Sequence, residues 1–271
     1  MIGLRNLFHR FGDFTLGPLS LSVPDGEYCV ILGPSGAGKS LLLQTIAGLV
    51  MPNEGQITVG ERDVTATAPE LRGIGLVFQQ SALFPHMSVE ENVLYGLRAR
   101  GVEQAERARR LAQVVERTGT GDLLTRPVAT LSGGEAQKVA IARALAVSPD
   151  VLLLDEPLSP IDHNTRLSLQ RELGRIHREL CLTTVHVTHS REEARALGSC
   201  CAIMMGGKII QAAPTEEVFE KPRCTFVASF LGVDAVKVKH APKCSVICVR
   251  QPGVCDAALE MATPPTGKGN S

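Results

Sequence analysis

The chain has 271 residues, in which 28 lysines and arginines balance 28 aspartates and glutamates. A chain of this length can bury a substantial core, and 44% hydrophobic against 21% charged residues excludes a wholly disordered protein. The zero net charge gives no electrostatic signature of nucleic acid or of an anionic membrane surface, so no nucleic-acid partner is predicted. No apolar run approaches the roughly 18 residues that cross a bilayer. The first residues carry no secretion signal, so a cytosolic protein is expected.

The N-terminal segment is strand-like and polar, and a short apolar run at residues 28–32 then predicts a buried strand. A glycine-rich stretch follows at residues 33–38, and residues 39–49 have helical composition. Strand, glycine loop and helix form half of a βαβ unit. Residues 55–64 alternate between apolar and polar side chains, which predicts a small antiparallel element.

The middle of the chain has a different pattern, with no strand between successive helices. Ser88 and Glu91 form a capping box at the start of the first of them. The three expected helices are residues 88–98, 103–117 and 135–147. Such a run predicts a helical insertion, at about residues 85–148, into an α/β core.

The core then resumes with an apolar strand at residues 151–154, which ends in Asp155 and Glu156. A second capping box is expected at Ser190 and Glu193. The further expected elements are helix 164–180, strand 183–188, helix 190–197, a hairpin over 201–211, and short helices at 215–220 and 225–231.

The first motif with a specific chemistry is the sequence GPSGAGKS, a complete phosphate-binding loop of the form G-x-x-x-x-G-K-S. Its glycines let successive backbone N–H groups face a phosphate, and the following helix adds its positive N-terminal end. The lysine is predicted to bind the outer phosphates and the serine hydroxyl to bind Mg²⁺. The motif comprises Gly33, Pro34, Ser35, Gly36, Ala37, Gly38, Lys39 and Ser40.

The second motif is the carboxylate pair Asp155 and Glu156 at the end of a predicted buried strand. A carboxylate beside a phosphate loop holds magnesium directly or through water, and this role is predicted for Asp155. Glu156 is then placed to polarise a water for in-line attack on the γ-phosphate.

The third motif is LSGGE at residues 131–135, which leads directly into a predicted helix. Exposed N–H groups at a glycine-rich helix start form an anion site. The motif is similar to the signature of ATP-binding cassette (ABC) transporters, and over about residues 1–232 the chain resembles the ATP-binding subunit of that family. The phosphate loop, the signature and the Asp155–Glu156 pair occur along this chain in the same order as in the family. A P-loop kinase would leave LSGGE unexplained.

The resemblance implies an α/β fold with a P-loop NTPase (RecA-like) core, an antiparallel β subdomain and an inserted α-helical subdomain. It also implies the roles of further residues. Gln79, ahead of Gln80, matches the glutamine that contacts magnesium and water. His189 matches the switch histidine at the γ-phosphate, whereas His186 faces the other side of its strand and is structural. Either Phe11 or Phe14 would stack on adenine, with Phe11 the first choice.

Several residues depart from the family's pattern. Leu41 stands where threonine is common and offers only its backbone N–H to ATP, and Pro160 stiffens the loop at residues 159–162 that crosses the family's dimer interface. Ala136 and Lys138 replace polar or arginine residues after the signature. None of these changes removes a catalytic group, so an active ATPase with ATP and Mg²⁺ is expected.

Family members pair head to tail, as a homodimer or with a second ATPase subunit, so the signature binds ATP in trans. In this chain the signature contacts would come from Ser132, Gly133, Gly134 and Glu135. Two transmembrane permease subunits and, indirectly, an extracytoplasmic solute-binding protein are the implied partners. They imply a peripheral location on the cytoplasmic face of the membrane.

The sequences at residues 81–92, 25–34 and 11–16 most resemble importers, and among them the molybdate/tungstate ATPases. Importers of sulfate, iron, polyamine or sugar are the alternative. An ABC ATPase without a transport role is a third possibility. However, repair ATPases insert a long coiled coil before the signature, and ribosomal ones carry two cassettes.

Residues 233–271 are expected to be a poorly ordered remnant of a regulatory β-domain, with two strands at 236–239 and 246–249 and no substrate-gated inhibition. The eight cysteines are expected to be free thiols, with Cys29 and Cys181 as small core residues. The spacings of His240, Cys244, Cys248 and Cys255 match no compact zinc knuckle.

Overall fold

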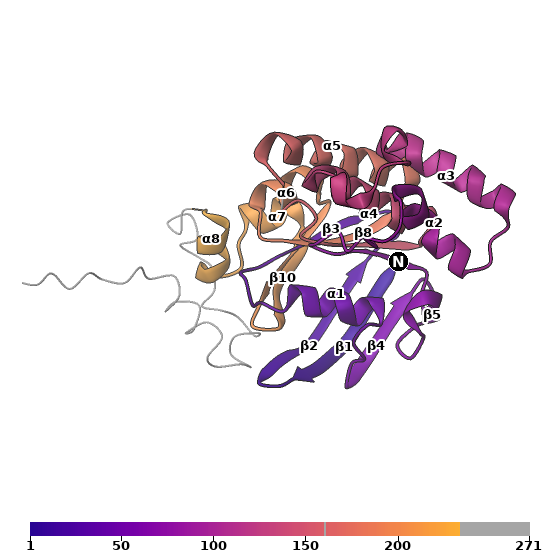
Figure 1. Ribbon diagram of the computed structural model, residues 1–271. Helices are drawn as coiled ribbons and strands as arrows, with labels where there is room; N and C mark the ends of the chain where they lie inside the picture. Colours follow the sequence, from indigo (N-terminus) through magenta and orange to yellow (C-terminus); the bar gives the residue numbers. More distant parts are fainter. Residues whose placement is uncertain (160, 234–271) are drawn as a thin grey trace, which may run out of the picture.

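The computed structural model describes residues 1–159 and 161–233 (Figure 1). Pro160 and the expectations for residues 234–271, namely the remnant strands, the disorder and the cysteine-rich spacing, lie outside the described residues. The strands form two sheets, and the helices cover them.

The smaller sheet is antiparallel, in the order β2-β1-β4-β5. Its strands are β1 (Ile2–Phe11), β2 (Phe14–Val23), β4 (Glu54–Val59) and β5 (Arg62–Asp63). The larger sheet has the order β10-β9-β3-β8-β7-β6 and is parallel except for β10, which runs antiparallel to β9. Its strands are β3 (Tyr28–Leu32), β6 (Ile74–Val77), β7 (Val151–Asp155), β8 (Thr183–Thr188), β9 (Cys200–Met205) and β10 (Lys208–Pro214).

Three consecutive helices without an intervening strand lie between β6 and β7, as expected from the sequence. They are α2 (Val89–Ala99), α3 (Gln104–Thr118) and α4 (Gly133–Ala146). The other helices are α1 (Lys39–Ala47), α5 (His163–Leu180), α6 (Arg191–Leu197), α7 (Thr215–Glu220) and α8 (Thr225–Leu231), with short 3₁₀ turns at Pro69–Leu71, Gly121–Leu123 and Val128–Thr130. The α/β architecture with an antiparallel β part is confirmed.

The central strand β3 is buried on both faces, which explains its unbroken apolar sequence. One face, with Cys29 and Ile31, packs on α1 and on the antiparallel sheet. The other, with Val30 and Leu32, packs under α2, α4 and α5. In Figure 1, α1 lies between the two sheets, and α2 to α5 form the upper layer. The loop after β3 therefore emerges from a strand that is buried on both faces.

The helix starts follow their capping residues. Ser88 and Glu91 form both halves of the predicted capping box at α2. The second predicted capping box, at Ser190 and Glu193, forms only one of its two hydrogen bonds, so that prediction is wrong in part. Ser190 Oγ accepts a hydrogen bond from the Glu193 backbone N–H, but the Glu193 carboxylate lies 3.4 Å from His186 Nε2 instead of returning to the cap. The buried histidine therefore competes for that carboxylate with the helix start.

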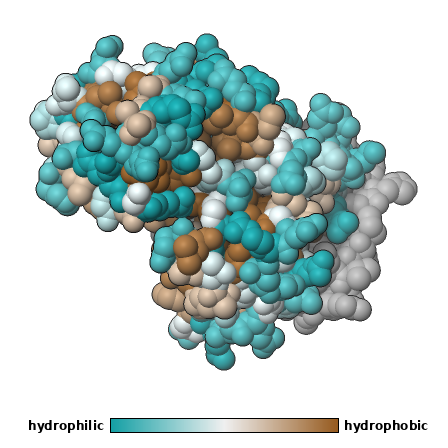
Figure 2. Space-filling model, turned by 90° about the vertical axis from the view of Figure 1, so that its right-hand side faces the viewer, coloured by the Kyte–Doolittle hydropathy of each residue, from teal (hydrophilic) through white to brown (hydrophobic). Residues whose placement is uncertain are grey.

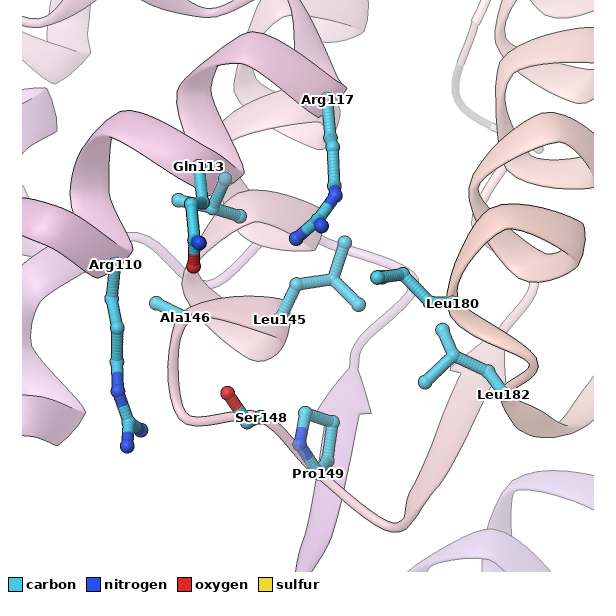
Figure 3. Close-up of a pocket in the computed structure, with 10 residues that line it drawn as sticks. Arg110, Gln113, Arg117, Leu145, Ala146, Ser148, Pro149, Leu180 and Leu182 are labelled. Atoms are coloured by element: carbon cyan, nitrogen blue, oxygen red, sulfur yellow. The ribbon is translucent and has the colours of Figure 1, made fainter.

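A pocket of about 180 Å³ lies where α3 meets the C-terminal ends of α4 and α5 (Figure 3). Arg110 and Arg117 from α3 border it, and Leu145 and Leu180 form its apolar side. The helix dipole favours cations near helix C-termini, which suits the two arginines. Because the lining residues come from both the helical insertion and the core, the pocket lies at the joint between them, and none of these residues is in the phosphate loop.

One buried cation fixes the far end of α1, the helix that follows the phosphate loop. Arg72 is fully buried, and its guanidinium donates hydrogen bonds to the carbonyls of Thr45, Ile46, Thr65 and Thr67. Burial lowers the pKa of this guanidinium.

Replacing Arg72 with methionine leaves these buried carbonyls short of donors. We expect the free energy of unfolding to fall by about 3 kcal/mol or more, measured by chemical denaturation. Arg62→Met is the control, because Arg62 is 58% exposed and pairs with Asp150 at the surface. That control is expected to change stability by less than about 0.5 kcal/mol. Equal effects of the two variants would contradict the structural role of Arg72.

Candidate nucleotide site

The phosphate loop connects the buried end of β3 to the first residue of α1. Gly38 has φ +96° and is the residue before the helix, a conformation that glycine adopts without strain. At Gly33 a Cβ atom would lie 2.3 Å from the carbonyl oxygen of Met204 in β9. The glycines therefore serve two purposes, a left-handed turn and a close approach to the neighbouring strand.

Lys39 begins α1, and its side chain is buried within the loop, at 6% exposure. The ammonium donates to the carbonyl oxygens of Gly33 at 2.8 Å and Pro34 at 3.1 Å. Burial lowers the pKa of Lys39, while Glu156 and Asp155 oppose that shift. The loop therefore contains a cation held by its own backbone.

Ser40, at the start of α1, contacts Asp155, at the end of β7. The Ser40 hydroxyl donates to Asp155 Oδ1 at 2.9 Å. Burial raises the pKa of Asp155, although the Ser40 hydrogen bond opposes this. A hydroxyl and a carboxylate are the oxygen ligands that Mg²⁺ prefers, so these two residues fit a magnesium ion.

The Glu156 carboxylate lies between the Lys39 ammonium and the His189 ring. Its Oε1 is 3.8 Å from Lys39 Nζ, and its Oε2 is 3.2 Å from Nδ1 of His189. The backbone of Glu156 has φ +43°, a left-handed conformation that is uncommon for this residue type and typical of functional sites. Its N–H donates to the Val187 carbonyl at 2.9 Å, which holds the strained residue against β8.

Gln79 and the two aromatic candidates line the same open pocket as the phosphate loop, with a volume of about 550 Å³. Gln79 Nε2 donates to Ser159 Oγ at 3.3 Å, a link between two loops that lie 80 residues apart. Gln80 is not among the lining residues. Phe11 and Phe14 both line the pocket, Phe11 is 64% exposed, and the Phe14 ring packs against Gly38.

The structure adds residues that the motifs did not indicate. Gln44, one turn into α1, lines the pocket, and Ser159 binds Gln79. The helical spacing of Gln44 from Ser40 was a usable signal, whereas the Ser159 contact depends on tertiary structure. His186 is fully buried, and its Nδ1 lies 3.0 Å from the Tyr28 hydroxyl, so its predicted structural role is confirmed.

The signature residues are not part of this pocket's lining. Ser132 caps α4, and its N–H binds the Glu135 carboxylate at 2.7 Å, which completes a capping box. Glu135 also pairs with Arg126 at 2.9 Å, so its carboxylate is engaged within its own chain. Lys138, one of the departures from the family pattern, pairs with Glu172 of α5 at 2.8 Å. Ser132 and Gly133 are exposed at the start of α4.

The raised pKa of Asp155 gives a stability prediction. A carboxyl group whose pKa is raised in the folded state destabilises the fold at pH values above its unfolded pKa. Asp155→Asn removes that cost and keeps an oxygen for Ser40. In calorimetry without nucleotide at neutral pH, the variant is expected to melt at a higher temperature than the wild type. The difference is expected to shrink as the pH falls through the folded pKa. A variant that melts lower at neutral pH would contradict the buried, ionised carboxylate.

Comparison with known proteins identifies the family. Residues 16–159, which include the phosphate loop, the signature and both carboxylates, match the ABC transporter family. The chain belongs to the ABC transporter family. A molybdate/tungstate import ATP-binding protein of Thermococcus kodakarensis is 46% identical to this ABC protein over 226 residues, which cover 83% of this chain and 68% of the relative. A sulfate/thiosulfate import ATP-binding protein of Nocardia farcinica is 43% identical over 86% of this chain and 70% of its own length.

A solved structure supports the same assignment. A dimeric, post-hydrolysis ATP-binding cassette bound to ADP and phosphate is 30% identical to this ABC protein, with a TM-score of 0.70 over 79% of this chain and 99% of that one. The predicted P-loop NTPase fold and ATP hydrolase class are thus confirmed. Within the part of this ABC protein that the structure describes, none of the helices combines the length and apolar character needed to span a bilayer.

Proposed function

We propose that this ABC protein hydrolyses ATP with the site built on Lys39, Ser40, Asp155, Glu156 and His189. The observation that carries the proposal is the position of Glu156, within 3.8 Å of the Lys39 ammonium and 3.2 Å of the His189 ring. The Ser40–Asp155 pair lies directly beside it. A carboxylate at the edge of a phosphate loop, next to a cation and a histidine, is suited to activate water.

The residues of the site divide the work of the proposed reaction. The backbone N–H groups of residues 35–41 bind the phosphates, and Lys39 exchanges its two carbonyl partners for phosphate oxygens. Glu156 accepts the proton of the attacking water, which Gln79 orients from the facing loop. His189 contacts the γ-phosphate. Ser40, Asp155 and Gln79 would hold Mg²⁺, which would supply positive charge at the phosphates. Phe11 or Phe14 packs on the adenine.

We further propose that the complete site needs a second cassette. The N-terminus of α4 is exposed at Ser132 and Gly133 and lies outside the lining of its own phosphate-loop pocket. Because Glu135 accepts the Ser132 N–H, the N–H group offered to a phosphate there is that of Gly133, with the Ser132 hydroxyl beside it. Such a helix start suits a phosphate bound by another chain. The dimeric cassette with bound ADP and phosphate is consistent with that arrangement. Because Glu135 is engaged with Arg126, its role is to hold the helix start rather than to bind ATP.

The proposed cellular role is to drive import through two separate permease subunits, from the cytoplasmic face of the membrane and with an extracytoplasmic solute-binding protein acting indirectly. Figure 2 shows a hollowed face on which apolar side chains border the hollow among polar ones. Exposed apolar patches of this kind are typical of protein interaction sites. The names of the relatives, both import ATP-binding proteins, support the same role.

The proposed solute is an oxyanion, molybdate or tungstate, because three relatives that are 41%, 43% and 46% identical to this ABC protein carry that name. A relative named for sn-glycerol-3-phosphate import is also 46% identical. Identity to a sulfate/thiosulfate relative is nearly as high, so sulfate import is the second candidate. The complex with its co-purifying permease and binding protein, placed in liposomes, is expected to increase ATP turnover when molybdate or tungstate is added. Stimulation by sulfate alone would overturn the choice of solute and leave the ATPase proposal intact. A lack of co-purifying permease would contradict the transport role.

A further inference from the structure

Two cysteines lie side by side on neighbouring strands at the opposite end of the sheet from the phosphate loop. Cys29 of β3 and Cys200 of β9 are register partners in a parallel pair. Parallel strands lie about 4.8 Å apart, which is within the Cα separation that disulfides span. Register partners point to the same face of a sheet, so both thiols face the antiparallel sheet.

The two thiols interact with each other and differ in access. A side-chain hydrogen bond from Cys29 lowers the pKa of Cys200, although burial and the Glu27 carboxylate oppose that shift. The same hydrogen bond, together with burial, raises the pKa of Cys29. Cys29 is 1% exposed, whereas Cys200 is partly exposed. Cys201 packs with the other face of the sheet. The pair therefore combines an accessible sulfur with a covered one.

A pocket leads to this pair from the surface. It has a volume of about 580 Å³, and its lining includes Cys29, Cys200 and, through the part of Cys201 that borders it, a third cysteine, together with Glu27 and Ser199. This volume admits a small molecule. The accessible thiol therefore meets solutes before the covered one does.

We propose that Cys29 and Cys200 form a dithiol site that undergoes thiol–disulfide exchange with low-molecular-weight disulfides. The Cys200 thiolate attacks one sulfur of the small disulfide, which forms a mixed disulfide and releases one small thiolate. Cys29 then loses its proton and attacks the Cys200 sulfur, which forms the Cys29–Cys200 bond and releases the second small thiolate. Two protein thiols are oxidised, one small disulfide is reduced, and the two protons end on the released thiols.

The reduced full-length protein, treated with glutathione disulfide and digested under acid quench, tests the proposal by peptide mapping. The wild type is expected to show a linked Cys29–Cys200 peptide, with the loss of both thiols. Cys29→Ser should retain glutathione on Cys200, because no second sulfur resolves the mixed disulfide. Cys200→Ser should leave Cys29 unmodified, because Cys29 is covered. Cys181 follows α5 and is exposed, so its predicted place in the core is wrong, and it serves as the internal control for reagent access.

Two results would overturn the proposal. One is a wild-type Cys200 that keeps its glutathione adduct, with no linked Cys29–Cys200 peptide in the map. The other is an absence of any reaction at Cys29 and Cys200 while Cys181 is modified. The wild-type map alone decides between these outcomes, so the proposal does not depend on the stability of the variants. ATP turnover of Cys200→Ser, measured in parallel, is expected to equal that of the wild type, since the pair lies outside the nucleotide site.

Discussion

Glu156→Gln is expected to slow ATP turnover by about 10²–10⁴-fold, the usual contribution of a general base. Glutamine keeps the shape of the side chain and a hydrogen-bonding group, but it cannot accept the proton of the attacking water. Glutamine and glutamate differ only at the end of the side chain, so glutamine adopts the uncommon backbone conformation of residue 156 at the same energetic cost. Lys39, Ser40 and Asp155 are unchanged, so ATP binding is expected to persist. Steady-state phosphate release and nucleotide binding, measured on the same preparation, separate the two effects.

The Glu156→Gln protein should also accumulate the closed dimer. If binding is intact and hydrolysis is slow, ATP remains at the interface between two cassettes, and size-exclusion chromatography in Mg-ATP should show a dimer that ADP does not support. Near wild-type turnover would instead move the catalytic role to another group. His189, 3.2 Å from the Glu156 carboxylate, is the first candidate.

Lys39→Ala is expected to fail at the earlier step and to remain monomeric in Mg-ATP. Each hydrogen bond from a charged group contributes about 1.5–3 kcal/mol, so the loss of one such bond to the phosphates lowers ATP affinity about 10- to 100-fold. The substitution also leaves the Glu156 and Asp155 carboxylates without a nearby cation, and their negative charge then weakens phosphate binding further. Equilibrium nucleotide binding measures the effect.

Lys221→Ala is the matched control for Lys39→Ala. Lys221 is exposed at the end of α7 and is not among the residues that line the nucleotide pocket. Its removal tests whether the loss of one positive charge anywhere on the protein weakens ATP binding. Equal losses in the two variants would contradict the specific role of Lys39.

The parts of the site that follow from local sequence could be predicted. The phosphate loop needs glycines at fixed positions next to a strand and a helix, and the structure has Gly33 and Gly38 at the two positions where a Cβ or a negative φ would not fit. The carboxylates after β7 and the signature before α4 also follow directly from their neighbours in the sequence. Parallel strands bring their carboxyl ends to one edge, which explains why the loops after β3 and β7, on the two sides of β8, reach the same site.

The parts that depend on tertiary contacts could not be predicted. The four-residue strand β6 is too short to show a clear pattern, so it was not predicted from the sequence. The second half of the capping box at Ser190 failed because Glu193 has a competing partner in the buried His186. Arg72 gave no signal of its burial, because an arginine in a sequence usually indicates an exposed position. The Gln79–Ser159 contact joins two distant loops.

The central claim is that one cassette's phosphate loop works with another cassette's signature. A mixture of two variants tests it most directly. Lys39→Ala lacks a working phosphate loop but keeps its signature, and Ser132→Arg blocks the exposed signature but keeps its phosphate loop. Each protein alone is expected to hydrolyse little ATP, and the mixture is expected to regain activity, because a mixed dimer contains one complete site. Wild-type turnover by Ser132→Arg alone, or no recovery when mixed dimers form, would contradict the claim.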